Sequence, residues 1–549
     1  MNRKVIVISS ISVFLSLFLA FALYKTHQYQ IMLQSMISKA NGGHMPAAVK
    51  DSTKIIEKIV GKTNAWRGVQ ESVKDTVVQI VSHVSELDLR QPYQTPRQYT
   101  GFGSGFFIND EGDIITNFHV VDQAKSIWIK VPSLGQRIID VTVVGVSPDR
   151  DIALLKVSAE GLKTIKDTIG TIPHLVLGNS DQVRRSDEVM ALGYPLAQQS
   201  LKSTTGVVSG REGNMIQMSA PINPGSSGGP LLNINGEVVG INAAGVVAAQ
   251  NVGYIIPIND LRVILPDLYK VKVLRKPFLG VLFNNATPSL TKYLGNPPPG
   301  GCYVVEVIKN STLYKAGIKR GDMIYEINGH KVDVYGDMSV VWSEDKVSII
   351  DYVSRLSVGQ DVQIVAYRSG ERKEITMKFS QAELPAIHKI YPGFQTVDYE
   401  VFGGMVVMQL TLNHIQALAK SAPGLVRFLE LKYQSDSALV VTHIFPNSQL
   451  DRTRVLPVGS TLNEVNGIKV KNLADFRLAI KKVKGDNLTL LASDQVTRAS
   501  DNIFVVLPFE KILKEEPRMS QEYRYPLSIT TRQLLAERMQ GQKDKSATT

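Results

Sequence analysis

The sequence has a single cysteine, Cys302, among its 549 residues. One thiol cannot form a disulfide within the chain, and it cannot build a cysteine-based zinc or iron–sulfur site. The chain also lacks a long block of one charge, although its formal net charge is +11. The densest basic run, Lys481-Lys482-Val483-Lys484, is so short that it indicates a solvated face. We therefore expect stability to come from hydrophobic cores, and we predict no nucleic-acid partner.

The 42 glycines and 25 prolines are too few and too scattered for a collagenous or low-complexity chain. The composition of 44% hydrophobic and 20% charged residues is typical of packed globular domains, so wholesale disorder is excluded. At roughly 150 residues per domain, the length predicts three to four domains.

One long apolar run without a charge extends from Val5 to Tyr24 and follows two basic residues. A run of this length can span a bilayer as a helix. Ala20-Phe21-Ala22 also matches the small-x-small pattern of signal-peptide cleavage. Both an uncleaved anchor and a cleaved signal export the rest of the chain, and we favour the anchor because the run continues past the potential cut. We predict residues 1–25 as this segment and residues 26–68 as a polar tether.

Residues 69–270 contain short β-branched and apolar runs separated by turn residues. The clearest runs are 76–81, 105–108, 113–116, 127–131 and 141–146. Many short strands at this spacing predict an antiparallel barrel or sandwich. A helix-like stretch at residues 259–269 closes the region.

A serine, Ser227, lies in the glycine-rich run Asn-Pro-Gly-Ser-Ser-Gly-Gly-Pro at residues 223–230. Such glycines let the backbone turn sharply and let a substrate approach the backbone amides. A serine nucleophile needs a histidine base and a carboxylate that orients this base. His119 ends a strand-like run, and Asp151 opens another. The order His, Asp, Ser is that of chymotrypsin-type double barrels.

The segments around these three residues resemble the HtrA/Deg family of serine proteases. The matching segments are Gly103–Phe106, Thr116–Val121, Asp151–Leu155, Leu192–Pro195 and Gly225–Gly229. This resemblance implies a chymotrypsin-like double β-barrel in a mostly β chain. It also implies that Ser227 is the nucleophile, His119 the general base and acid, and Asp151 the residue that orients His119. The backbone amides of Gly225 and Ser227 are then expected to form the oxyanion hole.

In this fold, the segment before the serine and a later strand form the walls of the specificity pocket. The expected wall residues are Pro221, Ile222, Asn242 and Ala243. None carries a charge, so we predict cleavage after small aliphatic side chains. The sequence departs from the family at Ser226, where Asn is usual, and at Ser219, where Asp is usual. These departures bear on the order of the oxyanion loop.

The tetrapeptide Phe278-Leu279-Gly280-Val281 resembles the carboxylate-binding loop of a PDZ domain, which we predict at residues 275–382. Such a domain binds a peptide C-terminus as an added strand at a sheet edge, while backbone amides hold the carboxylate. Cys302 is expected to be a buried strand residue of this domain.

A second and divergent copy, with Phe402-Gly403-Gly404-Met405, predicts another PDZ domain at residues 390–512. It has Ser460 where the first copy has Asp322. The copy resembles the plant-type Deg branch, in which the second PDZ domain tends to mediate assembly. Residues 513–549 are predicted to be a C-terminal tail, and residues 537–549 to be disordered.

These features predict an exported, ATP-independent serine endopeptidase of protein quality control and the stress response. Its expected substrates are unfolded or misfolded proteins, with a PDZ domain that binds peptide C-termini, and we predict no cofactor and no metal. The alternative is a chaperone or PDZ scaffold with little turnover. The resemblance implies a homo-oligomer, a trimer or multiples of it. In a bacterium, the protease would lie in the periplasm, free or anchored to the inner membrane.

Overall fold

A computed structural model of the protein describes residues 66–245, 252–277, 280–309, 311–379, 384–483, 485–497 and 502–547. The predicted signal or anchor lies outside these residues. Within the described residues, no helix is both long enough and apolar enough to cross a membrane. The chain divides at Ser72 into two units, and the second unit, Val73–Thr549, holds all the strands described below.

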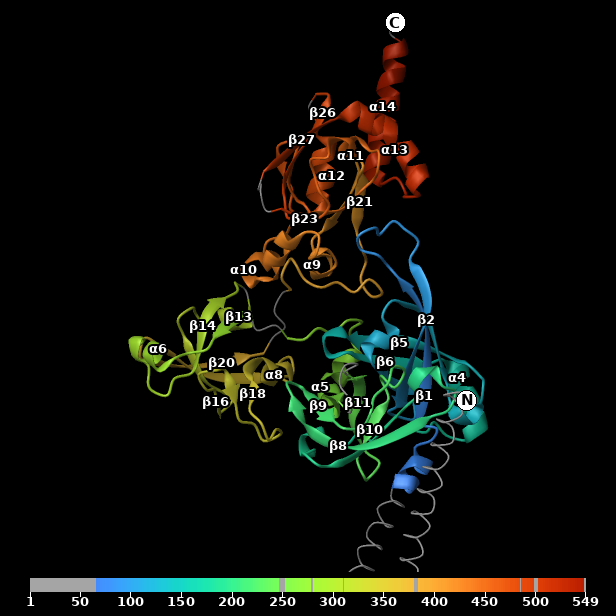
Figure 1. Cartoon of the computed structure of the whole chain (residues 1–549), viewed down its shortest axis with the longest axis vertical. Coiled ribbons are helices and arrows are strands. Elements are labelled where there is room, and N and C mark those ends of the chain that lie inside the picture. Colours follow the sequence, from blue (N-terminus) through green and yellow to red (C-terminus); the bar gives the residue numbers. More distant parts are fainter. Residues whose placement is uncertain are drawn as a thin grey trace, which may run out of the picture. The chain divides into compact units, whose positions relative to one another are not determined.

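Six antiparallel strands close a first barrel in the order β1-β2-β3-β6-β5-β4 (Figure 1). They are β1 (Val77–Glu86), β2 (Arg97–Phe107), β3 (Asp113–Thr116), β4 (Ala124–Lys130), β5 (Ile139–Ser147) and β6 (Ile152–Val157). The strands predicted from apolar runs between residues 76 and 146 are confirmed by β1 to β5. Val78, Ile80 and Phe107 are fully buried and belong to the hydrophobic cluster of this barrel.

Six further strands close a second barrel in the order β10-β11-β12-β9-β8-β7. They are β7 (Glu188–Gly193), β8 (Lys202–Glu212), β9 (Met215–Met218), β10 (Pro230–Leu232), β11 (Val238–Gly245) and β12 (Gly253–Pro257). Helix α4 (Ala159–Ile169) lies between the two barrels in the sequence, and α5 (Ile258–Leu268) follows the second. The helix predicted at residues 259–269 is therefore confirmed, and the protease part is a double β-barrel.

A third sheet, here called the first PDZ sheet, has the order β13-β14-β15-β19-β20, with β16 paired to β15. Its strands are β13 (Val281–Asn284), β14 (Cys302–Val307), β15 (Met323–Ile327), β16 (His330–Lys331), β19 (Asp361–Arg368) and β20 (Glu371–Lys378). The accompanying short strands and helices are β17 (Asp337–Met338), β18 (Val347–Ser348), α6 (Pro288–Tyr293), α7 (Thr312–Lys315) and α8 (Ile349–Ser354). Cys302 is buried in β14, as predicted, and burial raises the pKa of its thiol to about 12.

The last sheet, here called the second PDZ sheet, has the order β21-β22-β23-β24-β26-β27, with β25 paired to β24. Its strands are β21 (Tyr399–Phe402), β22 (Met405–Gln409), β23 (Leu439–Ile444), β24 (Thr461–Val465), β25 (Ile468–Lys469), β26 (Asn487–Ser493) and β27 (Ile503–Pro508). Its main helices are α9 (Leu412–Leu418), α12 (Leu473–Lys481), α13 (Phe509–Tyr523) and α14 (Ile529–Ala547). From β22 onward the strand order repeats that of the first PDZ sheet, and β21 is an additional strand at the edge.

The prediction of disorder for residues 537–549 is wrong over most of its length, because α14 continues to Ala547. Leu534, in the second turn of α14, is buried in the cluster that contains the apolar side chains of α12 and α13. This contact anchors the start of the helix, and the Gln, Glu, Lys and Arg residues that follow are good helix formers. Their polar composition alone suggested disorder. Figure 1 shows α13 and α14 beside the second PDZ sheet.

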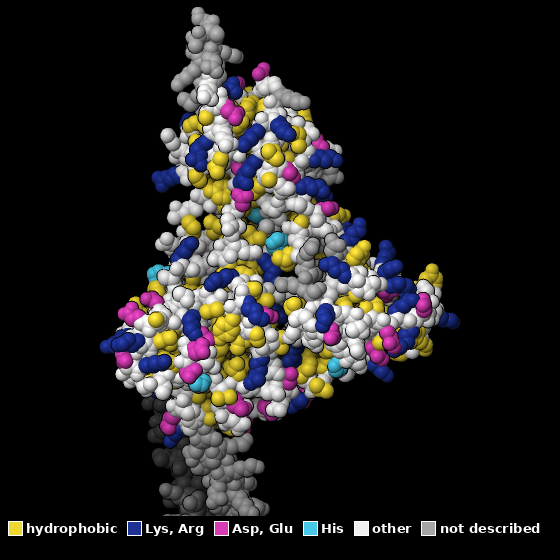
Figure 2. Space-filling model, turned by 180° about the vertical axis from the view of Figure 1, so that it is seen from behind, with side chains coloured by type: hydrophobic (Ala, Val, Ile, Leu, Met, Phe, Trp, Pro, Cys, Tyr) yellow, Lys and Arg dark blue, Asp and Glu magenta, His cyan; other side chains and the backbone are white. Residues whose placement is uncertain are grey.

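Charged side chains of both signs are mixed over the face that Figure 2 shows. This mixing agrees with the scattered basic residues of the sequence, because no single-sign field develops on that face.

Candidate active site

His119 lies on α3 (Phe118–Val121), a single helical turn that begins just after β3. The sequence placed His119 at the end of a strand, whereas the strand ends at Thr116. The backbone N–H of His119 donates to Asp151 Oδ1 at 2.9 Å, and His119 Nδ1 lies 2.8 Å from Asp151 Oδ2. The carboxylate therefore fixes both the backbone and the ring of His119. The His119 side chain is 50% exposed, so its opposite face is accessible to a substrate.

Asp151 follows the 3-10 turn η2 (Pro148–Arg150) and has a left-handed backbone, with φ of 55°. A left-handed aspartate is uncommon, and it turns the chain sharply before β6 begins. The side-chain amide of Asn117, which is buried, donates to the Asp151 carbonyl at 3.0 Å. The turn of His119 and the turn of Asp151 are thus joined by three hydrogen bonds.

Ser227 lies in the loop between β9 and β10. Its hydroxyl donates to the Ala243 carbonyl at 3.0 Å, and its own carbonyl accepts from the Ser104 N–H at 2.8 Å. Within the described residues, no hydrogen bond joins the Ser227 hydroxyl to His119. The structure thus brings His119 and Asp151 into contact and directs the Ser227 hydroxyl to the backbone of β11.

The backbone amides around Ser227 differ in their partners. Those of Ser226, Gly228 and Gly229 donate to the carbonyls of Asn223, Asn242 and Ser226, respectively. In the described part of the chain, the amides of Gly225 and Ser227 donate to no protein acceptor. Gly225 has φ of 97°, and a β-carbon there would lie 2.5 Å from the Tyr194 carbonyl oxygen, so only glycine fits. These two unengaged amides are the pair predicted to form an oxyanion hole.

Ser104, which the sequence reasoning did not select as a site residue, holds the Ser227 loop from the first barrel. It is fully buried in β2, and its hydroxyl donates to the Gly225 carbonyl at 2.7 Å. The same hydroxyl accepts from the Tyr194 N–H at 2.9 Å. The sequence feature that could have indicated this role is a small polar residue between two glycines, Gly103 and Gly105, beside a predicted strand.

The four expected pocket residues lie in different environments. Pro221 is exposed, Ile222 is half-buried, and Ala243 is buried. Asn242 is fully buried, and its side-chain amide donates to the Leu192 carbonyl at 2.9 Å and to the Ser226 carbonyl at 3.5 Å. Its side chain therefore supports the loop of Ser227 rather than facing an open pocket.

The expected carboxylate loop of the first PDZ sheet is described only in part, because Phe278 and Leu279 lie outside the described residues. Gly280 has φ of 70°, and its carbonyl accepts from the Ile308 N–H at 2.7 Å. A β-carbon on Gly280 would lie 2.2 Å from the Ser311 β-carbon. Glycine is thus required here by both conformation and space.

Strand β13, which begins at Val281, pairs with β14 on one side only, within the described residues. Its other edge carries the unpaired backbone groups that an added peptide strand needs. Phe283 of β13 and Ile349 and Val353 of α8 line one small apolar cavity. The first PDZ sheet therefore has a free edge among the described residues, and the buried apolar side chains of α8 lie near β13.

The second PDZ sheet has the same loop geometry. The Gly404 carbonyl accepts from the Phe445 N–H at 2.9 Å, and a β-carbon on Gly404 would lie 2.2 Å from the Ser448 β-carbon. Gly404 and Ser448 thus occupy the positions of Gly280 and Ser311. The outer edge of β22 differs, because β21 pairs with it in antiparallel register from Tyr399 to Phe402.

The loop amide of Gly403 in the second PDZ sheet also has a partner. It donates to Glu516 Oε1 on α13 at 2.8 Å, and Glu516 is 2% exposed. The other carboxylate oxygen accepts from the Tyr525 hydroxyl at 2.9 Å. Both the strand edge and the loop amide that a peptide C-terminus would use are therefore occupied by the chain itself.

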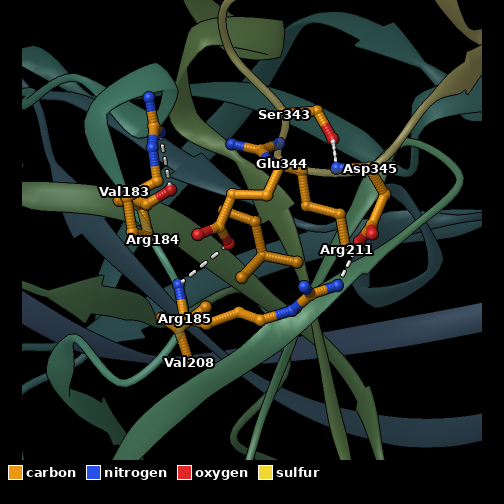
Figure 3. Close-up of a pocket in the computed structure, with 10 residues that line it drawn as sticks. Val183, Arg184, Arg185, Val208, Arg211, Ser343, Glu344 and Asp345 are labelled. Carbon is orange, nitrogen blue, oxygen red and sulfur yellow. Dashed lines mark hydrogen bonds and ion pairs between the residues drawn. The ribbon is translucent and has the colours of Figure 1, made fainter. Parts of the chain in front are cut away.

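Figure 3 shows a pocket that contains none of the predicted site residues. Arg185 pairs with Asp345 there, and its backbone N–H donates to Glu344 Oε2 at 3.2 Å. The Arg184 guanidinium donates to the Asp181 carbonyl at 2.7 Å. Arg184 and Arg185 are therefore engaged with other groups of the protein.

Two family models match the chain: that of the trypsin-like peptidase domain over residues 103–241, and that of the PDZ domain over residues 277–379. The putative serine protease HhoB of Synechocystis is 32% identical over 303 residues, which cover 51% of this chain and 68% of that protein. A probable periplasmic serine endoprotease, DegP-like, of Marinomonas is 26% identical and covers 82% of this chain and 91% of its own length.

Among solved structures, the HtrA-type protease AlgW with decapeptide is 24% identical, with a TM-score of 0.45, and the match covers 58% of this chain and 99% of that one.

The double barrel and the His119–Asp151 pair define a trypsin-like serine peptidase that carries a PDZ domain. Together with the curated relatives, they show that the chain belongs to the HtrA/DegP-like family of serine proteases.

Proposed function

We propose that the protein is an ATP-independent endopeptidase that cleaves unfolded or misfolded proteins through an acyl-enzyme formed on Ser227. The main support is the His119–Asp151 contact of 2.8 Å together with the unengaged amides of Gly225 and Ser227. Several relatives are named as periplasmic serine endoproteases, which favours proteolysis over a scaffold without turnover.

In the proposed reaction, the Ser227 hydroxyl leaves the Ala243 carbonyl and rotates toward His119 Nε2. His119 accepts the hydroxyl proton while Ser227 Oγ bonds to the scissile carbonyl carbon. The C–N bond then breaks, and His119 returns the proton to the leaving amine. Water, activated by the same histidine, releases the acyl group in the second half. Asp151 holds the ring and stabilises the imidazolium.

The amides of Gly225 and Ser227 would bind the oxygen that becomes negative in the tetrahedral intermediates. A single donor of this kind contributes about 3 kcal/mol to transition-state stabilisation. Ser104 supports this geometry, because its hydroxyl holds the carbonyl of Gly225.

We infer that Pro221, Ile222 and Ala243 contribute to a pocket for small aliphatic side chains. These residues carry no charge that could neutralise a buried Lys or Arg of the substrate. Asn242 would shape this pocket only through the backbone that its side chain holds.

The free edge of β13 is the proposed site for peptide C-termini, with the carboxylate bound at the loop of Phe278, Leu279, Gly280 and Val281. We also propose an exported protein, because relatives are named periplasmic and the N-terminal run is apolar. Attachment to the membrane through residues 1–25 and assembly as a homo-oligomer, a trimer or multiples of it, belong to the same proposal.

The test is digestion of unfolded casein by residues 69–549, with the Ser227→Ala variant as the matched control. We expect fragments that end in small aliphatic residues, and none from the variant. Equal protection of casein from aggregation by both proteins, without fragments, would instead support the chaperone or scaffold function.

A further inference from the structure

A segment between the two PDZ sheets in the sequence is buried against the first barrel. Tyr391 is 3% exposed and belongs to the hydrophobic cluster of that barrel. Its ring lies edge-on to that of Phe118, with 5.4 Å between centroids, and the ring of Phe394 lies 5.8 Å from that of Phe118. Phe118 directly precedes His119 on α3, so these two rings contact the turn that carries the proposed base.

The same segment also reaches the other end of α3. A β-carbon on Gly393 would lie 2.9 Å from the N and Cα atoms of Gln123, which follows α3 by two residues. Glycine therefore permits a close approach of two backbones at this point. The segment covers α3 from Phe118 to just past its C-terminal end.

Tyr391 contacts the turn of Asp151 as well. Its hydroxyl donates to Asp149 Oδ1 at 2.9 Å, and Asp149 Oδ2 accepts from the Lys276 N–H at 3.1 Å. Asp149 belongs to η2, the turn that ends at Asp151. One side chain thus contacts both short turns of the proposed catalytic pair.

The position of Tyr391 is itself fixed. Its N–H donates to Gln395 Oε1 at 2.9 Å, and its carbonyl accepts from the backbone N–H groups of Phe394 and Gln395 at 2.9 Å. The Arg275 guanidinium lies over the ring, 5.0 Å from its centroid. These contacts hold the ring and hydroxyl in one arrangement, which is what a positioning group requires.

We propose that Tyr391 is a positioning residue that holds the turns of His119 and Asp151 in the arrangement needed for catalysis. The proposal rests on the proposed function, because that function gives His119 and Asp151 their catalytic roles. The two turns contain only four and three residues, so they have few internal hydrogen bonds to fix their relative placement. Misplacement of a catalytic group by about 1 Å can cost about a hundredfold in rate.

The first measurement is the kinetics of a short fluorogenic peptide, which does not need a PDZ domain for binding. We expect Tyr391→Ala to lower kcat by about tenfold to a hundredfold, with KM within about twofold of the starting protein. Tyr391→Phe keeps the ring and loses only the bond to Asp149, so we expect a decrease in kcat of about threefold to tenfold.

The matched control is Ile387→Ala. Ile387 is fully buried in the same segment but packs in a cluster of the second PDZ sheet, so we expect its kcat to stay unchanged. If both variants fold and Tyr391→Ala has the same kcat as Ile387→Ala, the proposal is overturned. If Tyr391→Ala does not fold, Tyr391→Phe decides alone, and an unchanged kcat for this variant overturns it.

The second measurement is hydrogen exchange of the peptide that spans residues 117–121, read by mass spectrometry. The His119 N–H donates to Asp151 Oδ1, so loosening the two turns exposes it. We expect faster exchange in both Tyr391 variants and wild-type exchange in Ile387→Ala. This readout needs no activity: an inactive starting protein contradicts the proposed function, whereas unchanged exchange contradicts the positioning role.

Discussion

The two PDZ sheets share a strand order and a glycine loop but differ in what lies along the peptide edge. In the first, β13 has a free edge within the described residues. In the second, β21 pairs with the edge of β22, and Glu516 accepts a hydrogen bond from the loop amide of Gly403. The same backbone scaffold therefore presents an open site in one copy and a site filled by its own chain in the other.

The two PDZ sheets also differ in the position of their buried ion pair. In the first sheet, Asp322, which is 1% exposed, pairs with Arg368 at 2.7 Å. In the second, Ser460 replaces this aspartate, and the buried pair joins Glu400 of β21 to Arg477 of α12 at 2.6 Å. The second sheet thus uses its buried carboxylate to hold the strand that fills its groove.

The most direct test of this difference concerns peptide binding. Gly280→Val introduces a side chain at positive φ against Ser311, so we expect the affinity for a peptide with a free C-terminal carboxylate to fall by at least about tenfold. Gly404→Val should leave this affinity unchanged, because β21 already pairs with the corresponding edge of the second sheet. Fluorescence anisotropy in the Ser227→Ala background measures both, with the amidated peptide as control. A loss of peptide affinity in Gly404→Val would contradict the difference between the two sheets.

The next effect is on stability. Arg477→Met leaves the Glu400 side chain, which is fully buried, without its cation, at an expected cost of about 3–5 kcal/mol. Hydrogen exchange of residues 399–409 at increasing denaturant measures this loss locally. The double variant with Glu400→Gln should recover much of it, because no buried charge remains unpaired. A stability unchanged by Arg477→Met alone would show that β21 is held by other contacts.

A smaller effect depends on pH. Burial raises the pKa of Glu516 to about 7, although hydrogen bonds from Tyr525 and Gly403 oppose the shift. The folded state therefore holds this proton to a higher pH than the unfolded state does, and the stability contribution of Glu516 declines as pH rises from about 4.5 to about 7.

Glu516→Gln removes this charge, so we expect its free energy of unfolding to rise relative to wild type, by up to about 3 kcal/mol between pH 4.5 and pH 8. Thermal unfolding across this range measures the trend. Glu522→Gln, an exposed carboxylate on the same helix, is the control and should show no such trend. If the difference in free energy of unfolding between Glu516→Gln and wild type does not change with pH, the Glu516 carboxylate is solvated rather than buried.

The smallest effect is expected at Ser460. Its hydroxyl is buried, and among the described residues it has no hydrogen-bond partner. Ser460→Ala should therefore change stability by no more than about 1 kcal/mol, in the stabilising direction. Asp322→Ala at the corresponding place in the first sheet should cost about 3 kcal/mol or more. Comparable losses from both would mean that Ser460 has a partner.

The local patterns of the sequence were sufficient for the family and for the residues of the proposed triad. Gly225, Gly280 and Gly404 have positive φ, and this backbone requirement is local, so the glycines can be recognised in the sequence. The short β-branched and apolar runs likewise predicted the barrel strands, and strands such as β3 and β6 are buried over nearly their whole length.

Only the tertiary structure decided which copy of the PDZ scaffold has an open edge. Glu516 is 113 residues from Gly403, and Tyr391 is 242 residues from Asp149. Ser104 lies 121 residues from Gly225. These contacts depend on how distant elements pack and on the burial that this packing imposes. No local spacing encodes them, whereas the turns and strands they support follow from the sequence by itself.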